Sequence, residues 1–424
     1  MDIQFQSNCN LKTQKTALRV SVANLIILFF IVVILADGAN QILKYLDFNF
    51  FRVSIFIRFA GLIFFLLLLI YKRKAGIIIA IIVFFYGVFL IGSLATSHNY
   101  ENYLWFENFS MINKMLFFFI VVQTLRTTFT NQKNRDRLFL VFEYILLLQS
   151  IVVILSFLFR IEMFASYRSG IRFGYDGLIP ARNEASAFFV IAFFYFLWKF
   201  HIQQKGLIQL FLVALAALIT GTKVVLVIPI IILMYVTREI IGMKGLKLRK
   251  QYFFATMIVL SIVTIAFLQS DFIINTITPT LNYYSVRLDK LGFSILDILL
   301  SGRHFRTEVF ISEFLPRFNF VNYIFGGHDI AKFATESDLV DVFIRLGLIG
   351  GSLFFFLYLK FLLPTGQPIT FTHLLFVFIW IGISVTAGHI VFSAINGGYL
   401  AILVFFISTT IYPIKQQSKL NSVQ

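Results

Sequence analysis

Arginines crowd one short polar stretch of this chain, residues 160–184, which reads RIEMFASYRSGIRFGYDGLIPARNE. The four are Arg160, Arg168, Arg172 and Arg182. A guanidinium group presents a planar fork of donors that suits phosphate oxygens, so the stretch predicts an anion-binding site. Arg168 and Arg172 stand four residues apart, on one face if the segment is helical, and Asn183 follows Arg182. In the alternative interpretation, the arginines contact lipid headgroups or pair with Glu162, Asp176 and Glu184.

A second group of reactive side chains lies in ESDLVDVFIRLGLIGG, residues 336–351. Glu336 has no obvious local partner, which makes it a candidate general base, and Asp338 is close behind it. Asp338, Asp341 and Arg345 fall at i, i+3 and i+7, so they share one face of a helix. Charged groups at membrane depth point into a helix bundle and pair there. Asp341 is therefore either part of the substrate site or one half of a structural ion pair with Arg345.

Further candidate binding residues lie in three other segments. Arg303 and Arg306 have a helical spacing in SGRHFRTEVF. His328 follows two glycines in NYIFGGHDI, and His389 lies in TAGHIVFSAING, although a lone histidine is more often a packing residue. Lys223 stands at the tip between two apolar runs, where it either snorkels to the membrane interface or faces a polar cavity.

The composition places these residues in a membrane protein. The chain has 424 residues, 59% of them hydrophobic, with 55 Phe and only 13% charged residues. A soluble protein of this size could not bury so much apolar surface, so the chain must cross the membrane several times. Its net charge of +16 does not indicate nucleic-acid binding, because the basic residues form short runs between apolar segments. Cys9 is the single cysteine, which excludes an intramolecular disulfide.

Twelve apolar segments are long enough to predict an all-α fold of about twelve transmembrane helices. They are residues 18–36, 53–71, 75–95, 109–125, 138–159, 184–201, 207–220, 222–237, 252–269, 338–361, 369–387 and 393–413. The seventh and eighth are nearly continuous, but Thr220-Gly221-Thr222 favours a tight turn between them over one long buried helix.

Basic residues fall in alternate loops of this arrangement, which predicts both termini in the cytoplasm. The cytoplasmic tails are then residues 1–17 and 414–424, with helices one to nine in 18–269 and helices ten to twelve in 337–413. The arginine-rich loop, 160–183, lies on the outer side against the positive-inside bias, and binding an anionic substrate explains it best. A long outer loop, about 270–336, is expected to form short amphipathic helices against the membrane.

Five segments, in order, resemble the O-antigen polymerase and O-antigen ligase family of bacterial membrane glycosyltransferases. They are IRFGYDGLIPARNEASA, LITGTKVVLVIP, SGRHFRTEVF, NYIFGGHDI and ESDLVDVFIRLGLIGG. These segments are spread over about 180 residues, whereas the first 150 residues match only as generic spans. The resemblance implies a glycosyltransferase C-like fold that acts on the outer face of the bacterial cytoplasmic membrane. It also implies oligosaccharides on undecaprenyl diphosphate as substrates.

The resemblance further assigns roles to individual residues. The arginines that hold the diphosphate in this family correspond by position to Arg172 and Arg303. Ligases tend to place a histidine at a set distance before a G-x-x-G motif, and in this chain that slot, counted back from Gly347, holds Glu336. This departure favours the polymerase branch over the ligase branch. Lys223 replaces the arginine usual after the small-residue turn.

The sequence as a whole therefore predicts a metal-independent polymerase of surface-polysaccharide repeat units, without cofactors, in O-antigen or capsule synthesis. Its expected partners are the lipid-linked oligosaccharide, the bilayer, and a flippase and chain-length regulator of the same pathway, but no nucleic acid. Two alternatives stay open. One is a ligase that transfers the finished glycan to lipid A core, and the other is a flippase or transporter for the lipid-linked unit. Transporters tend to have internal repeats and helices broken near the midplane.

Overall fold

The computed structural model describes most of the chain. The described residues are 21–48, 53–97, 102–167, 172–203, 205–226, 228, 231, 278, 280, 282–286, 294, 297, 300, 302–365, 368–386 and 388–410. Arg168, both predicted tails, all of the ninth predicted span and most of the eighth lie outside the described residues. So does most of 270–301.

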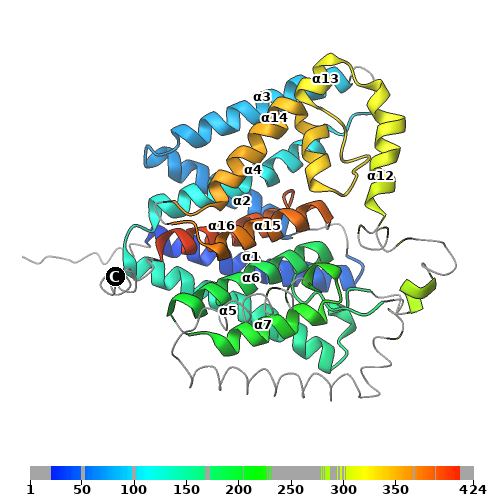
Figure 1. Ribbon diagram of the computed structural model, residues 1–424. Coiled ribbons are helices and arrows are strands. Elements are labelled where there is room, and N and C mark those ends of the chain that lie inside the picture. Colours follow the sequence, from blue (N-terminus) through cyan, green and yellow to red (C-terminus); the bar gives the residue numbers. More distant parts are fainter. Residues whose placement is uncertain are drawn as a thin grey trace, which may run out of the picture.

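Helices make up nearly all of the regular structure in these ranges (Figure 1). The first seven are α1 (Val22–Tyr45), α2 (Val53–Tyr71), α3 (Gly76–Ser97), α4 (Trp105–Thr128), α5 (Gln132–Leu158), α6 (Arg182–Gln203) and α7 (Leu207–Ile219). The later ones are α12 (Arg303–Val309), α13 (Phe320–Phe325), α14 (Asp338–Leu362), α15 (Phe371–Thr386) and α16 (Ala394–Thr409). The only β pairing among the described residues is one isolated antiparallel bridge between Ala165 and Tyr175. The predicted all-α class is therefore confirmed.

Seven of the described helices, α1 to α6 and α14, are long and apolar enough to cross a membrane. Helices α7, α15 and α16 are apolar but shorter, and they coincide with the seventh, eleventh and twelfth predicted spans. Helix α7 ends before Thr220, and Gly221 adopts a left-handed backbone with φ of +65°, as the predicted turn requires. The chain is thus a multi-pass membrane protein.

Helix α1 continues nine residues beyond its predicted end at residue 36, which corrects the bounds of the first predicted span. An isolated charge in hydrocarbon costs roughly 2.5–3.5 kcal/mol, so Asp37 needs a partner inside this longer helix. In the structure Asp37 is fully buried and forms an ion pair with Arg58 of α2. The partner compensates for the charge, and the helix continues to Tyr45.

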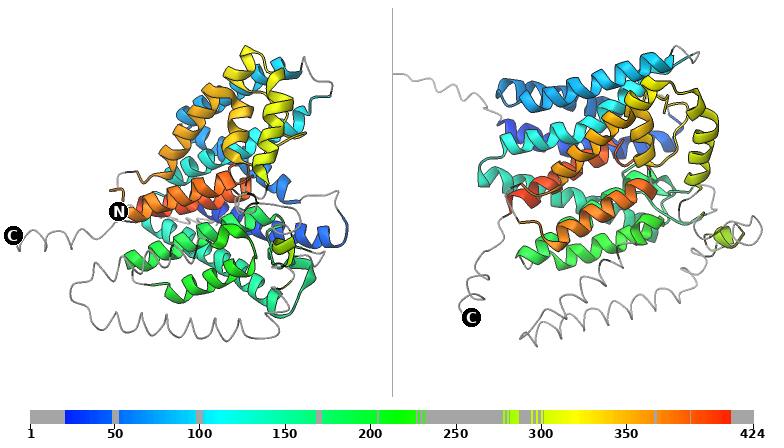
Figure 2. Two further views of the ribbon diagram at one scale, coloured as in Figure 1. Left: turned by 45° about the vertical axis from the view of Figure 1, so that its right-hand side comes forward. Right: turned by 45° about the horizontal axis from the view of Figure 1, so that its top comes forward.

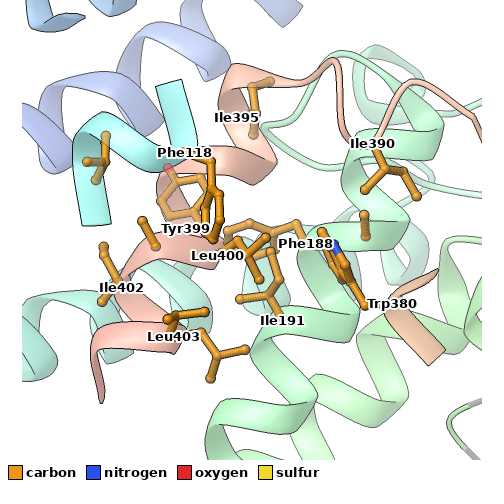
Figure 3. Packing of buried hydrophobic residues seen from close by; sticks show 14 of the residues in the cluster. Phe118, Phe188, Ile191, Trp380, Ile390, Ile395, Tyr399, Leu400, Ile402 and Leu403 are labelled. Atoms are coloured by element: carbon orange, nitrogen blue, oxygen red, sulfur yellow. The ribbon is translucent and has the colours of Figure 1, made fainter. Parts of the chain in front are cut away.

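Helices α6 and α16 lie in the middle of the bundle, where α16 packs against both α4 and α6 (Figures 1 and 2). Every residue from Ala185 to Trp198 and from Ile395 to Ile407 is buried, so these helices are apolar on all sides. Figure 3 shows Phe118 of α4 and Phe188 of α6 packed around Tyr399 of α16. The rings of Phe188 and Tyr399 meet edge to face, with centroids 4.9 Å apart.

Helix α14 is broken at Gly347, whose φ of +65° and ψ of −172° are not helical. The break leaves backbone carbonyls without helical partners. The loop after α13 supplies donors instead, because the Gly327 N–H bonds the Arg345 carbonyl at 2.9 Å and the His328 N–H bonds the Ile344 carbonyl at 3.2 Å. A Cβ on Gly327 would lie 2.0 Å from the Gly92 carbonyl oxygen of α3. The segments around Gly327 and Gly347, predicted only as separate motifs, therefore interlock.

Candidate functional site

Most predicted site residues gather at one end of the helix bundle, which we call the arginine end. Here α1, α3, α5, α7 and α15 finish, and α2, α4, α6, α14 and α16 begin. Helices α12 and α13 lie at this same end, on the right in Figure 1. The basic run 72–74 lies at the opposite end, where the Lys72 amine bonds Thr128 at 3.0 Å and Arg126 bonds Thr365 at 2.9 Å. The two ends therefore carry separate groups of cations.

Arg172, Arg182 and Lys223 form the first cluster, which we call the tyrosine–arginine cluster. The Arg172 guanidinium donates to the Tyr284 hydroxyl at 2.6 Å and lies 4.6 Å from the centre of the Tyr167 ring. The Arg182 guanidinium lies over the same Tyr167 ring, 3.8 Å from its centre. The Lys223 amine is 5.6 Å from the Tyr284 ring centre. These cation–π contacts hold three positive charges close together.

Two glycine turns bring these cations together from distant parts of the sequence. A Cβ on Gly221 would lie 2.2 Å from the Phe173 carbonyl oxygen, and one on Gly174 would lie 2.4 Å from the Thr220 carbonyl oxygen. The Tyr175 N–H bonds the Ile219 carbonyl at 3.1 Å, at the end of α7. Only glycines permit this close approach, and it places the residue after Gly221-Thr222, which is Lys223, beside Arg172. Asn183, the second residue of α6, lies at this end of that helix.

Asp176 of the arginine-rich loop is buried, and its carboxylate makes the stability of the fold depend on pH. Burial raises the pKa of Asp176 to about 6, while the Ser166 hydroxyl, Arg182 and Lys44 partly oppose the rise. Because this folded-state pKa lies above the unfolded value of 3.8, Asp176 contributes stability that is complete below about pH 4. That contribution, on the order of 2–3 kcal/mol, is lost as the pH rises through 6.

We expect Asp176→Asn to remove this dependence, since the amide oxygen still accepts from Ser166 and carries no charge. Thermal unfolding of the purified protein measured between pH 4 and 7 checks it. The wild-type melting temperature should fall with rising pH relative to that of the variant. Asp136→Asn is the matched control, because Asp136 is exposed at the opposite end and accepts a hydrogen bond from Gln132 on the helix surface. Parallel curves for wild type and Asp176→Asn would contradict the assignment.

Glu336, Arg303, Arg306 and His389 form the second cluster, which we call the glutamate cluster. The sequence offered no obvious local partner for Glu336, and its partners are distant: the carboxylate pairs with Arg306 at 2.6 Å and lies 3.9 Å from Arg303. The partners were not apparent because α12 begins 33 residues earlier in the chain. Arg303 is buried and donates to the Thr386 carbonyl, whereas the side chains of Arg306 and Glu336 are 49% and 37% exposed. The carboxylate is thus held by arginines and open to a ligand.

The backbone around Glu336 is held by two buried carboxylates. Asp341 accepts from the Thr335 N–H and hydroxyl, both at 2.8 Å, and from the Glu336 N–H at 3.1 Å. Asp338 accepts from the N–H groups of His389, Ile390 and Val391. Its carboxylate therefore fixes the turn between α15 and α16 against the start of α14. Both aspartates are fully buried. They hold the backbone on either side of Glu336 and are not exposed to a ligand as its carboxylate is.

Of the two alternatives for Asp341, the ion pair with Arg345 is wrong. Arg345 is fully buried and donates to Asn108 at 2.5 Å, the His328 carbonyl at 2.8 Å and the Tyr103 hydroxyl at 3.2 Å. The common helical face predicted for the two residues does not bring them together, because Asp341 is used by the turn at Thr335. Arg345 instead ties α14 to the start of α4.

His328 is packed away from both clusters. Its ring is buried among phenylalanines, with centroids 5.0 Å from those of Phe310 and Phe314, and it contacts the Phe333 carbonyl at 3.1 Å. Burial lowers the pKa of His328 to about 4, so the ring is neutral at physiological pH. Burial also lowers the pKa of His389, with Glu336 opposing the shift. His389 belongs to the glutamate cluster, whereas the structure places His328 in a packing role.

The sequence interpretation did not name Lys114 as a site residue, and it considered Glu184 only as a partner of the arginines. Glu184 of α6 bonds the Ser393 hydroxyl and lies within electrostatic reach of Lys114, Asp37 and Arg58. Lys114 is also within electrostatic reach of His389. A signal was present, because charged residues inside apolar spans are rare and mark functional sites. These residues join the two clusters through a polar lane, defined by Glu184, Lys114, Ser393 and His389.

No protein-family model, curated protein or solved structure matches this chain.

Proposed function

We propose that this protein is a polymerase that joins undecaprenyl-diphosphate-linked oligosaccharide repeat units into a surface polysaccharide. The observation that carries the proposal is the arginine end itself. Two cationic clusters flank one polar lane, and the exposed carboxylate Glu336 lies within the second of them. Each cationic cluster can bind the diphosphate of one lipid-linked substrate, and the Glu336 carboxylate can accept the proton of the attacking hydroxyl. The order of the motifs, which resembles the O-antigen polymerase family, supports the same assignment.

In the proposed reaction the anomeric carbon of the growing chain is attacked by a hydroxyl of the incoming lipid-linked unit. A new glycosidic bond forms, and the bond from the anomeric carbon to the diphosphate breaks. Glu336 takes the hydroxyl proton, while Arg172, Arg182 and Arg303 stabilise the negative charge that develops on the departing lipid diphosphate. Arg306 positions the Glu336 carboxylate through the 2.6 Å contact. The buried Asp338 and Asp341 hold the backbone on which these groups stand.

The proposed setting is the outer face of a bacterial cytoplasmic membrane, with the arginine end facing outward and both termini in the cytoplasm. The helix ends support it, because the basic residues 72–74 and Arg126 meet at the opposite end, as the positive-inside bias requires of the cytoplasmic side. Accessibility labelling checks this orientation. A cysteine placed at Asn102, in a chain whose Cys9 is replaced by serine, should react with an impermeant reagent added outside the cytoplasmic membrane.

Deletion of the gene and electrophoresis of the surface glycan test the function. Loss of the ladder, with one repeat unit still attached to its acceptor, supports a polymerase. Loss of all attached glycan, with lipid-linked polymer accumulating, indicates the ligase alternative. Accumulation of single lipid-linked units on the inner leaflet indicates a flippase. An unchanged ladder would overturn the proposal.

Arg172→Ala should weaken binding of the lipid-linked donor about 10- to 100-fold, as expected for losing a hydrogen bond to a charged group. Long chains should disappear from the gel while protein abundance is unchanged. Arg73→Ala is the matched control, because Arg73 lies in the turn between α2 and α3 at the opposite end. A normal chain-length distribution in Arg172→Ala would remove this residue from the mechanism.

A flippase or transporter remains the second candidate, because one observation favours it. Transporters tend to use membrane helices that are broken inside the bilayer, and α14 is broken at Gly347 with the buried Arg345 beside the break. However, the backbone groups opened there are bonded by Gly327 and His328, which leaves them occupied within the protein. The inner-leaflet accumulation described above separates the two functions.

A further inference from the structure

Three helices meet in the polar lane between the two clusters, and Lys114 is the cation that α4 contributes. Helices α4 and α16 both begin at the arginine end, so they run in the same direction. They touch where a Cβ on Gly397 would lie 3.5 Å from the Phe118 backbone. One helical turn closer to the arginine end, this register brings Lys114 of α4 to the level of Ser393. The Ser393 hydroxyl bonds Glu184 of α6, so all three helices contribute a polar group at one level.

The charged residues around Ser393 are compatible with a positive charge on Lys114. Asp37 and Arg58 pair with each other and are compensated. The Glu184 carboxylate accepts a hydrogen bond from Ser393, and Lys114 lies within its electrostatic reach. His389 lies four residues before Ser393 and connects the lane to Glu336. Lys114 is thus within electrostatic reach of Glu184, which follows Arg182 of the first cluster by two residues, and of His389 in the second cluster.

Depth distinguishes Lys114 from the arginines. It is nine residues into α4, or about 14 Å along the helix axis from Trp105. Arg172 and Arg306 lie in connections outside the long apolar helices. A diphosphate attached to a polyprenyl chain is kept near the membrane surface, because its tail lies in the hydrocarbon. The long stem of a lysine can carry its amine towards that level.

We infer that Lys114 binds the phosphate group of a polyprenyl-diphosphate lipid from within the membrane layer, between the two cationic clusters. This inference rests on the proposed function and adds a residue and a depth to that site. The ligand chemistry is a phosphate group, which a lipid or a free pyrophosphate could supply. The position of Lys114 inside a membrane helix favours the lipid.

Binding to the purified full-length protein in lipid nanodiscs tests the inference, with undecaprenyl diphosphate, undecaprenol and inorganic pyrophosphate as probes. The wild type should bind undecaprenyl diphosphate more tightly than either other probe. Lys114→Met, which keeps the apolar stem, should weaken that binding about 10- to 100-fold, and Lys114→Arg should retain most of it. Lys360→Met, at the exposed opposite end of α14, should bind like the wild type. Thermal melting of each variant confirms that it is folded, and if Lys114→Met unfolds, Lys114→Gln takes its place.

The other outcomes of these experiments separate failure of the Lys114 inference from failure of the proposed function. Equal binding of undecaprenyl diphosphate by wild type and Lys114→Met would overturn the inference. Equal binding of pyrophosphate and the lipid would overturn the lipid assignment. If the wild type binds none of the probes and the deletion strain keeps its ladder, the proposed function fails as well. If the deletion strain loses its ladder but Lys114→Met restores it fully, only the role of Lys114 fails.

Discussion

Glu336→Gln should slow polymer formation about 10²–10⁴-fold, the usual contribution of a general base. The amide has nearly the same volume, and the backbone N–H of residue 336 can still bond Asp341, so the fold should be kept. Binding of the lipid-linked substrate should fall little or improve, because Arg303 and Arg306 keep their charges. In vitro polymerisation with purified lipid-linked units, measured beside substrate affinity, gives both quantities.

The matched control for that variant is Glu313→Gln, an exposed carboxylate in the π-helical turn Phe310–Phe314. It should polymerise at the wild-type rate. A Glu336→Gln enzyme that retains full turnover would exclude Glu336 as the base. Loss of substrate binding together with turnover would instead indicate that the carboxylate contacts the sugar.

Gly327→Ala should unfold or strongly destabilise the α3–α13–α14 region. The residue has φ of +102°, and its new Cβ would lie 2.0 Å from the backbone oxygen of Gly92. Strain and overlap against backbone atoms together should cost at least about 3 kcal/mol, because neither neighbour is a flexible side chain. The expected result is a large drop in melting temperature in detergent, or loss of monodisperse protein.

Gly87→Ala on α3 is the comparison for this substitution, because a Cβ there meets nothing within 4 Å. It should be neutral or slightly stabilising, since alanine favours helix. If Gly327→Ala melts like the wild type, the interlocked arrangement of the loop and the broken helix is incorrect. The same result would also show that the loop around Gly327 does not supply the hydrogen bonds at the break in α14.

Some features of the site depend on contacts that no local pattern indicates. Arg172 bonds Tyr284, 112 positions later in the chain, and Glu336 pairs with Arg306 on a separate helix. Lys114 was visible as a charge inside an apolar segment, but its neighbours Glu184 and Ser393 come from two other helices. Hydropathy locates a membrane helix but does not determine its rotation about its axis or its neighbours. The partners of each charge therefore could not be predicted.

The sequence by itself determined the membrane class, the helical fold and ten of the twelve predicted apolar segments as helices. The reason is physical, because only helices satisfy the backbone of an apolar segment inside hydrocarbon, and about 20 residues are needed to cross it. It also indicated the turn at Gly221, since glycine adopts a left-handed backbone more readily than any other residue. The tertiary structure alone decided that Asp37 lies inside α1, that Asp341 and Arg345 do not pair, and that the two clusters share one polar lane. Those outcomes depend on which buried charges and carbonyls find partners when the helices pack, and packing joins residues that are far apart in the sequence.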